Sequence, residues 1–383
     1  MSAPRLAEDW LRGHVWPRFS RVMRRDGIYL ANHSLGRPPD RVAEDVRQAL
    51  DAWYRDLSDA WQPWLEAREH WRALTAQLVG APRADCIVPK TSAGQGLRAV
   101  LNALEGRPRV LASDGEFDSL DFILRVYRDK NRIALKIVPW RELDPAGCDL
   151  LVISSVMFRS GEIVAEPAAL VRRAHAAGAK VLLDVYHGAG VVPTDLAALE
   201  VDFAVGGSYK YLRGGPGACW LYVRPDRLES LRTLDTGWFA KRDMFAFLRP
   251  DPPQFGAGGD AWLESTPAVL APFQALAGLE LTLELGVERL RVYSLEQKRR
   301  LAALLRQEAV GVEGEGESHG AFLTLPHPRA GELAAELEAR GVSADARGDQ
   351  LRLCPDFLNS SAELGRAAAL LGELARERSS PRV

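Results

Sequence analysis

The sequence has few cysteines, no long apolar run and almost no net charge. Four of its 383 residues are cysteine, namely Cys86, Cys148, Cys219 and Cys354. They are too few and too scattered for a disulfide framework or a zinc knuckle. No run approaches the roughly 18 apolar residues that span a bilayer, and the N-terminus lacks the apolar core of a signal peptide. A formal charge of −2 argues against a general electrostatic grip on nucleic acid or an anionic membrane. We therefore expect a cytoplasmic protein that binds neither.

Several catalytic signatures are also missing. The seven histidines show no His-x-x-x-His or His-Glu-x-x-His spacing, so no metal site is expected. No Gly-x-Ser-x-Gly elbow is present. No Gly-x-Gly-x-x-Gly follows an early strand, which makes a dinucleotide-dependent dehydrogenase a poor candidate.

Helical and strand-like patterns alternate along the chain. Apolar residues recur at helical spacing after Pro39 and Asp40, and a second helix is expected to stop at Gly80. From residue 85 short apolar runs alternate with amphipathic stretches. The predicted strands are residues 86–89, 109–113, 135–140, 149–155, 180–186, 202–207 and 218–223. Strands that are apolar on both faces and separated by helices indicate a mainly parallel sheet sandwiched by helices.

These patterns divide the chain into three segments. Residues 1–80 form an N-terminal helical segment that packs with a small domain or a dimer partner. Residues 81–260 form a large α/β domain. Residues 261–383 form a long helix and a smaller α+β domain.

Two chemically suited residues follow strands of the predicted sheet. Asp184 ends the run 180–186, and Lys210 follows the run 202–207, between two tyrosines and ahead of a glycine-rich stretch. In isolation, such an aspartate caps a turn and such a lysine is solvated. Because ligands bind at the C-terminal ends of parallel strands, however, both side chains are expected to face one crevice.

The arrangement around these two residues resembles the kynureninase family, in the class V branch of fold type I pyridoxal-phosphate enzymes. The shared pattern is Asp-x-x-His-x-x-Gly from Asp184, followed by Ser-Tyr-Lys-Tyr-Leu around Lys210. Further matches, in the family's order, are residues 28–39 (IYLANHSLGRPP), 156–164 (VMFRSGEIV), 236–241 (TGWFAK), 263–270 (LESTPAVL) and 351–360 (LRLCPDFLNS). The resemblance covers roughly residues 25–375 and implies the fold type I architecture.

The resemblance implies a pyridoxal 5′-phosphate site. Lys210 would hold the cofactor covalently, and Asp184 would keep its ring nitrogen protonated. His187 would support the ring and Phe117 would stack on it, although either could equally be an ordinary core residue. Tyr209 would reach the phosphate and relay protons during catalysis.

The phosphate donors are expected in residues 90–104 (KTSAGQGLRAVLNAL), which supply Thr91 and Ser92 ahead of a helix. Ser92 also suits a helix N-cap, and the two roles are compatible. By resemblance Trp238 reaches the same phosphate. Ser265 and Thr266 would approach it from a second subunit, which implies a homodimer with shared active sites.

The substrate-binding residues are the third part of the implied site. Arg352 would clamp the α-carboxylate of an amino-acid substrate, with a structural salt bridge as the alternative. His33 lies in the N-terminal signature, where the family has asparagine. Trp64 could line the substrate mouth, although the tryptophans are most simply core and interface anchors.

The implied reaction is hydrolysis of the β,γ-carbon bond of L-kynurenine, or a related β-aroyl alanine, to anthranilate and L-alanine in tryptophan catabolism. Leu120 in place of an aspartate, and Ala240-Lys241 in place of Gly-His, depart from the family pattern. A class V aminotransferase or another lyase therefore remains an alternative, as does a non-catalytic member. Cysteine desulfuration is disfavoured because residues 311–350 contain no cysteine.

Overall fold

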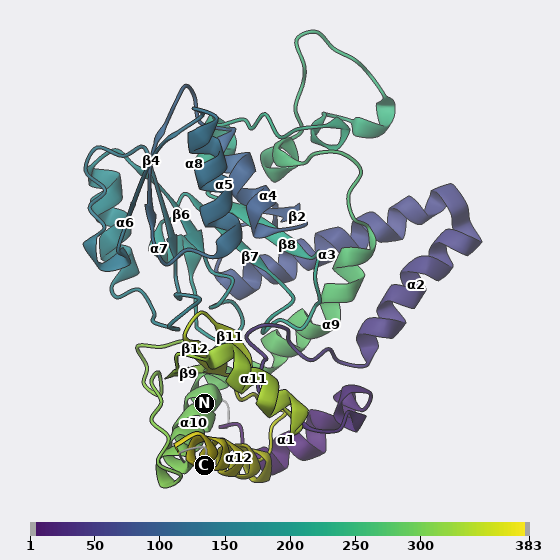
Figure 1. Ribbon diagram of the computed structural model, residues 1–383. Helices are drawn as coiled ribbons and strands as arrows, with labels where there is room; N and C mark the ends of the chain where they lie inside the picture. Colours follow the sequence, from purple (N-terminus) through teal and green to yellow (C-terminus); the bar gives the residue numbers. More distant parts are fainter. Residues whose placement is uncertain (1–4, 380–383) are drawn as a thin grey trace.

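A computed structural model of the protein describes residues 5–379. Figure 1 shows a larger part built on a seven-stranded sheet, and below it a smaller part that carries both ends of the chain. The sheet has the order β2-β8-β7-β6-β5-β3-β4. Its strands are β2 (Ile87–Lys90), β3 (Arg109–Ser113), β4 (Ala134–Val138), β5 (Leu150–Ser154), β6 (Lys180–Asp184), β7 (Phe203–Gly207) and β8 (Cys219–Val223).

The predicted fold class is confirmed. Each apolar run expected to be a strand contributes one to this sheet. Strand β8 pairs antiparallel with both β2 and β7, whereas the pairs among β4, β3, β5, β6 and β7 are all parallel. The parallel register places the C-terminal residues of β5, β6 and β7 along one edge, where a ligand site is expected.

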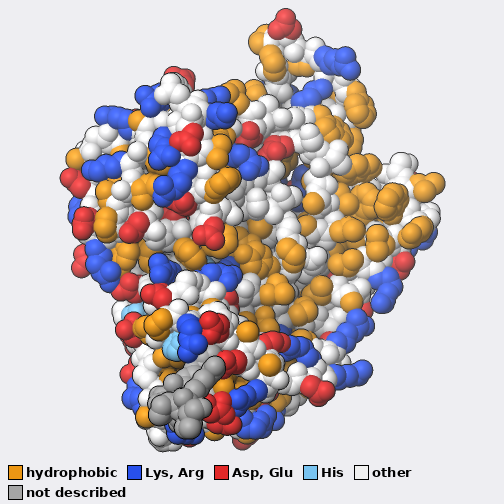
Figure 2. Space-filling view, viewed as in Figure 1, with side chains coloured by type: hydrophobic (Ala, Val, Ile, Leu, Met, Phe, Trp, Pro, Cys, Tyr) orange, Lys and Arg blue, Asp and Glu red, His pale blue; other side chains and the backbone are white. Residues whose placement is uncertain are grey.

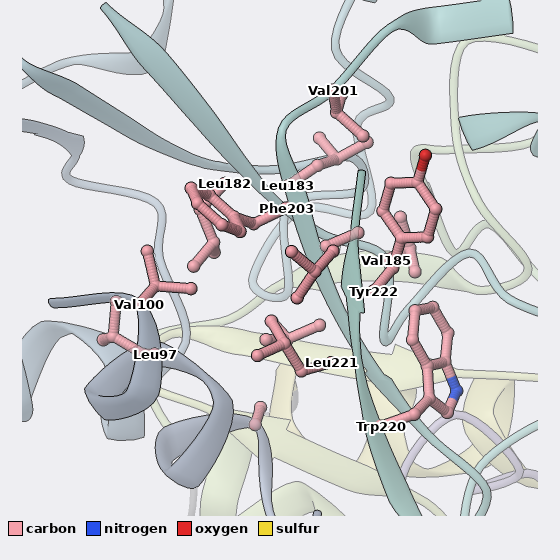
Figure 3. Packing of buried hydrophobic residues seen from close by; sticks show 14 of the residues in the cluster. Leu97, Val100, Leu182, Leu183, Val185, Val201, Phe203, Trp220, Leu221 and Tyr222 are labelled. Carbon is pink, nitrogen blue, oxygen red and sulfur yellow. The ribbon is translucent and has the colours of Figure 1, made fainter. Parts of the chain in front are cut away.

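Helices α4 (Ala93–Leu101), α5 (Asp118–Asp129), α6 (Pro167–Ala176), α7 (Leu196–Leu199) and α8 (Pro225–Ser230) follow strands of this sheet. Figure 3 shows how α4 packs: Leu97 and Val100 face Leu221 of β8, while Trp220 and Tyr222 point to the opposite face. Burying each large apolar side chain contributes roughly 1.5–3 kcal/mol relative to exposure. The residues at the C-terminal ends of these strands are therefore supported by a sheet whose side chains are closely packed.

The N-terminal segment contains helices α1 (Glu8–His14), α2 (Arg41–Asp56) and α3 (Trp61–Val79). As expected, α3 ends at Gly80, which adopts the left-handed conformation with φ 64°. The segment also contains a strand that helical periodicity did not predict. Strand β1 (Ile28–Tyr29) pairs parallel with β10 (Val342–Ser343) and so ties the N-terminal segment to the C-terminal part.

The expected long helix after residue 261 is two helices. These are α9 (Leu270–Leu285) and α10 (Val287–Gln307), bent by 84° at Gly286. Gly286 has φ 81°, a conformation that interrupts a helix and that glycine adopts without strain. Within residues 5–379 no single helix is long and apolar enough to cross a membrane. The two helices of this bent pair reach that length and apolar composition only when they are taken together.

The C-terminal part is built on a three-stranded antiparallel sheet of order β11-β12-β9. Its strands are β9 (Leu323–Pro326), β11 (Asp345–Arg347) and β12 (Gln350–Leu353), and its helices are α11 (Ala330–Ala339) and α12 (Ser361–Ser379). Leucines of α10, α11, α12 and this sheet form a second apolar core beside that of the large sheet.

Gly36 brings the N-terminal loop against the backbone of the residue expected to be catalytic. Its N–H donates to the Tyr209 carbonyl at 2.8 Å, and a β-carbon at Gly36 would lie 1.9 Å from the Lys210 carbonyl oxygen. We expect Gly36→Ala to lower the free energy of unfolding by about 1–3 kcal/mol through overpacking. Gly13→Ala, where a β-carbon meets nothing within 4 Å, is the matched control. Thermal unfolding of both variants measures the difference, and equal melting temperatures would contradict the close approach.

Candidate active site

Asp184 and Lys210 lie in one cavity at the C-terminal edge of the large sheet. Asp184 is the last residue of β6, and Lys210 follows β7. The cavity has a volume of about 190 Å³. The predicted site residues that line it are Thr91, Ser92, Phe117, Asp184, His187, Tyr209 and Lys210. Residues far apart in the sequence are thus brought together by strand ends, as the sheet pattern predicted.

Lys210 is 5% exposed and faces an aromatic wall. Its Nζ lies 2.7 Å from His187 Nε2 and 5.5–5.8 Å from the ring centres of Phe117, Tyr186 and Tyr209. Burial lowers the pKa of Lys210 to about 7, with a further contribution from Arg352. The amine can therefore lose its proton near neutral pH, as a nucleophilic lysine requires.

Asp184 is buried with one oxygen bonded and one available. Oδ1 accepts the backbone N–H of Tyr186 at 2.8 Å, and within residues 5–379 Oδ2 has no hydrogen-bond donor. Burial raises the pKa of Asp184 to about 6, against the opposing effect of Lys210. A protonated ring nitrogen at Oδ2 would supply both the missing donor and the missing positive charge.

His187 is held neutral. Burial first, and then Lys210, keeps the pKa of its imidazole well below the usual value. Nε2 therefore accepts from Lys210, which leaves the proton on Nδ1, a buried nitrogen that has no partner within residues 5–379. His187 can hold the lysine amine in place without adding a second positive charge.

Thr91 and Ser92 form the N-terminus of α4. The side chain of Ser92 caps the helix by accepting the backbone N–H of Gln95 at 3.1 Å, so the N-cap interpretation of Ser92 is correct. The backbone N–H and hydroxyl of Thr91 both donate to Gln95 Oε1, at 2.7 and 3.1 Å. This amide oxygen occupies the donors that a phosphate oxygen would use at a helix start.

Two aromatic residues complete the wall of the cavity. Phe117 is the N-cap residue of α5, and its ring meets Phe158 edge-on with centroids 5.6 Å apart. Tyr209 is tilted against Tyr186 at 4.9 Å. Burial raises the pKa of Tyr209 to about 12, so its hydroxyl keeps its proton.

Six predicted site residues lie outside the lining of this cavity, and four of them are Trp64, Trp238, Ser265 and Thr266. Trp64, Ser265 and Thr266 line a second cavity of about 290 Å³, which shares Thr91, Gly217 and Cys219 with the first. Trp64 is buried, and its Nε1 donates to the Ala49 carbonyl at 3.0 Å. Trp238 lines neither cavity, and its Nε1 donates to Thr266 Oγ1 at 3.1 Å. Within one chain these residues do not reach Lys210.

The predicted substrate residues Arg352 and His33 are not part of the cavity lining. The Arg352 guanidinium donates to the carboxylate of Asp345 and to the Phe158 carbonyl. It therefore makes the structural salt bridge that was the alternative interpretation. His33 Nε2 lies 3.4 Å from Asp345 Oδ2, and burial lowers the pKa of its imidazole to about 3.

Sequence reasoning missed Glu116, a fully enclosed carboxyl group beside the site. Glu116 accepts from the Ser113 hydroxyl and from both the N–H and the hydroxyl of Ser154. Ser154 is the sheet neighbour of Asp184. Burial raises the pKa of Glu116 to about 7, opposed by the serine hydrogen bonds. Its position next to Phe117 was the available signal, but its partner Ser154 lies on another strand, β5.

The buried amine of Lys210 makes the stability of the cofactor-free protein depend on pH. With a folded pKa of about 7 and an ordinary value of 10.5, the unfolded chain binds more protons between these two values. Stability must therefore rise with pH across that window, by about 1 kcal/mol per pH unit for this group. We expect the melting temperature of the apo-protein to increase from pH 7 to 9. Lys210→Met should reduce the rise, and Lys298, whose pKa burial also lowers to about 7, should account for the part that stays. Equal slopes would contradict the lowered pKa of Lys210.

Comparisons with known proteins agree with this geometry. A family model described as aminotransferase class-V matches residues 127–311. The kynureninase of Deinococcus radiodurans is 31% identical over 91% of this chain and 91% of its own length. That of Bacillus mycoides is 30% identical over 88% of this chain and 85% of its own. The chain belongs to the kynureninase family.

Solved structures at lower identity show the same fold. A cysteine desulfurase from Thermococcus onnurineus has a TM-score of 0.81 at 18% identity, covering 98% of this chain and 100% of that one. The cystine C-S lyase C-DES has a TM-score of 0.81 at 18% identity, covering 93% and 99%. Members of the kynureninase family are pyridoxal-phosphate-dependent enzymes of fold type I, and the expected cofactor and enzyme class are thereby confirmed.

The cavity fits this cofactor on three independent observations. Asp184 Oδ2 lacks a donor at one end, and the amine of Lys210 loses its proton near neutral pH. Thr91 and Ser92 place N–H and hydroxyl groups at a helix N-terminus on the lining. Within residues 5–379, no group of three or more His, Cys, Asp or Glu side chains could hold a metal ion.

Proposed function

We propose that the protein hydrolyses the β,γ-carbon bond of L-kynurenine, or of a related β-aroyl alanine, to anthranilate and L-alanine. The observation that carries the proposal is the shared cavity of Asp184 and Lys210 in a chain of the kynureninase family. When bound, pyridoxal phosphate withdraws electrons from the α-carbon of an amino-acid substrate.

Each residue of the cavity has a role in this proposal. Asp184 keeps the ring nitrogen protonated through a charged hydrogen bond. Lys210 would hold the cofactor, and its amine would take the α-proton of the substrate. His187 accepts a hydrogen bond from the Lys210 amine and so positions it.

The later steps need a proton donor and a water molecule. Water adds to the γ-carbonyl carbon, the β–γ bond breaks, and anthranilate leaves. The remaining three-carbon fragment takes up a proton and leaves as alanine. Tyr209 is the proposed proton relay, because burial raises the pKa of its hydroxyl to about 12 and so keeps it protonated. Arg352 is the proposed partner of the substrate carboxylate.

The phosphate group is assigned to the start of α4 and, in part, to a second subunit. Thr91 and Ser92 would bind it within one chain. Trp238 is proposed to reach the same phosphate. Ser265 and Thr266 are proposed to reach the phosphate of a partner subunit, because neither lines the cavity of its own chain. Trp64 is proposed to line the mouth of the shared site.

A homodimer also accounts for the apolar surface. Figure 2 shows hydrophobic side chains gathered over α2 and α9 and on the protruding loop that follows α8. Large apolar side chains left exposed in these segments are Trp53, Tyr54, Leu57, Phe245, Phe247 and Leu248. Single exposed apolar residues are ordinary, but a cluster of this kind marks an interaction site. The proposed location of the enzyme remains the cytoplasm.

One incubation tests the proposed reaction. The purified, cofactor-loaded protein is mixed with L-kynurenine or 3-hydroxykynurenine, and release of the fluorescent anthranilate is followed. The proposal expects release without any added keto acid. A protein that leaves both substrates intact but transfers their amino group to a keto acid would instead be a class V aminotransferase.

A further inference from the structure

The residue proposed to grip the substrate carboxylate already faces a carboxylate of its own chain. Asp345 of β11 is the direct cross-strand neighbour of Arg352 of β12. Directly opposed residues on antiparallel strands project from the same face of the sheet. The Arg352 guanidinium accordingly donates to Asp345 Oδ2. The Arg352 side chain is buried at 3% exposure, and that of Asp345 is partly buried at 11%.

Both terminal nitrogens of Arg352 already have an acceptor in the same chain. One terminal nitrogen serves Asp345 and the other serves the Phe158 carbonyl. Nε is buried and has no hydrogen-bond partner among the described residues. A bidentate grip on a carboxylate needs two parallel N–H groups on one edge of the guanidinium. A substrate carboxylate at the Nε edge would have to share with Asp345 the terminal nitrogen that completes that edge, and would meet the negative charge of that residue there.

Asp345 also forms an ion pair with a second arginine, Arg347. Its other oxygen, Oδ1, accepts from Arg347 at 2.7 Å, and the Arg347 side chain is 43% exposed. Burial alone would raise the pKa of Asp345, but His33 and Arg352 outweigh it and hold the pKa well below its usual range. Asp345 is thus charged at neutral pH, and Arg347 can keep it paired when Arg352 turns away.

We propose that Asp345 is an internal competitor for the substrate carboxylate. It occupies Arg352 in the free enzyme and passes to Arg347 when an α-carboxylate binds. This inference rests on the proposed role of Arg352, and it adds a residue that sets how strongly the enzyme binds its amino-acid ligands. Removing the charge of Asp345 should strengthen binding of any ligand with an α-carboxylate and leave its carboxylate-free counterpart unaffected.

The test titrates the absorbance of the bound cofactor with L-alanine and with ethylamine, which has the same carbon-bound amine without the carboxylate. For Asp345→Asn we expect L-alanine to bind about tenfold more tightly, the equivalent of about 1.4 kcal/mol, and ethylamine to bind as in the wild type. Asp349→Asn is the matched control. Asp349 lies on the same hairpin, is exposed and pairs with Arg159, so its removal should change neither constant.

A second variant has the opposite expected sign. Arg347→Met removes the alternative partner and leaves the contact between Asp345 and Arg352 in place, so L-alanine should bind several-fold more weakly. If Asp345 only orients Arg352, Asp345→Asn will instead weaken L-alanine binding, and the inference is overturned. An equal change for L-alanine and ethylamine also overturns it. Failure to release anthranilate would reject the proposed reaction, but the binding constants of L-alanine and ethylamine could still be measured and compared.

Discussion

Replacing Lys210 with alanine is expected to reduce anthranilate release by at least about a thousandfold, because the same amine holds the cofactor and moves the α-proton. Folding should survive, since the change removes a buried amine whose pKa burial has lowered to about 7. Fluorescence of released anthranilate measures turnover, and circular dichroism measures folding.

Lys130→Ala is the matched control for this experiment. Lys130 is exposed at the C-terminal end of α5, so its loss should leave turnover within experimental error. Wild-type turnover by Lys210→Ala would remove Lys210 from the mechanism. An unfolded Lys210→Ala protein would instead show that the residue is structural.

The second large effect is expected at Asp184. Asp184→Asn removes the negative charge that would face the ring nitrogen, and a charge-assisted hydrogen bond contributes about 1.5–3 kcal/mol. The dissociation constant of the cofactor should therefore rise roughly tenfold to a hundredfold. Turnover should fall by a larger factor than cofactor affinity, because a pyridine ring whose nitrogen has lost its proton is a weaker electron acceptor. Equilibrium dialysis measures the binding constant.

Asp202→Asn separates this effect from simple destabilisation. Asp202 is equally buried but is structural: it accepts from the Val181 N–H and pairs with Arg224 and Arg227. Its replacement should lower the melting temperature and leave cofactor affinity unchanged in the folded protein. If both aspartate variants lower the melting temperature and neither changes cofactor affinity, Asp184 does not serve the cofactor.

The sequence predicted the large sheet well because its strands are short, apolar on both faces and separated by helices. This pattern also located Asp184 and Lys210, since strand ends of a parallel sheet converge whatever their separation in sequence. It failed at β1, where two residues pair with a strand more than 300 positions away. It also failed at Gly286, where a positive φ breaks an otherwise continuous helical pattern.

Side-chain partners were harder to predict than strand ends. The carboxylate of Asp345 faces Arg352 only because a hairpin sets their register, and no spacing in the sequence fixes that register. Glu116 was not predicted as part of the site, because Ser154, whose hydroxyl donates a hydrogen bond to its carboxyl group, lies on another strand. The predicted positions of Trp238, Ser265 and Thr266 at the cofactor remain predictions, because within one chain they lie outside the cavity.

The meeting of Asp184 and Lys210 around one cofactor is the central claim, and reduction with borohydride followed by peptide mapping tests it most directly. The yellow holoenzyme should bleach, and the pyridoxyl group should be recovered on the peptide that contains Lys210 and on no other. In Asp184→Asn, reconstituted at the same cofactor concentration, the yield of that peptide should fall. Recovery of the pyridoxyl label on Lys90 or Lys298 would contradict the claim. So would a protein that, after incubation with pyridoxal phosphate and before reduction, shows no yellow chromophore.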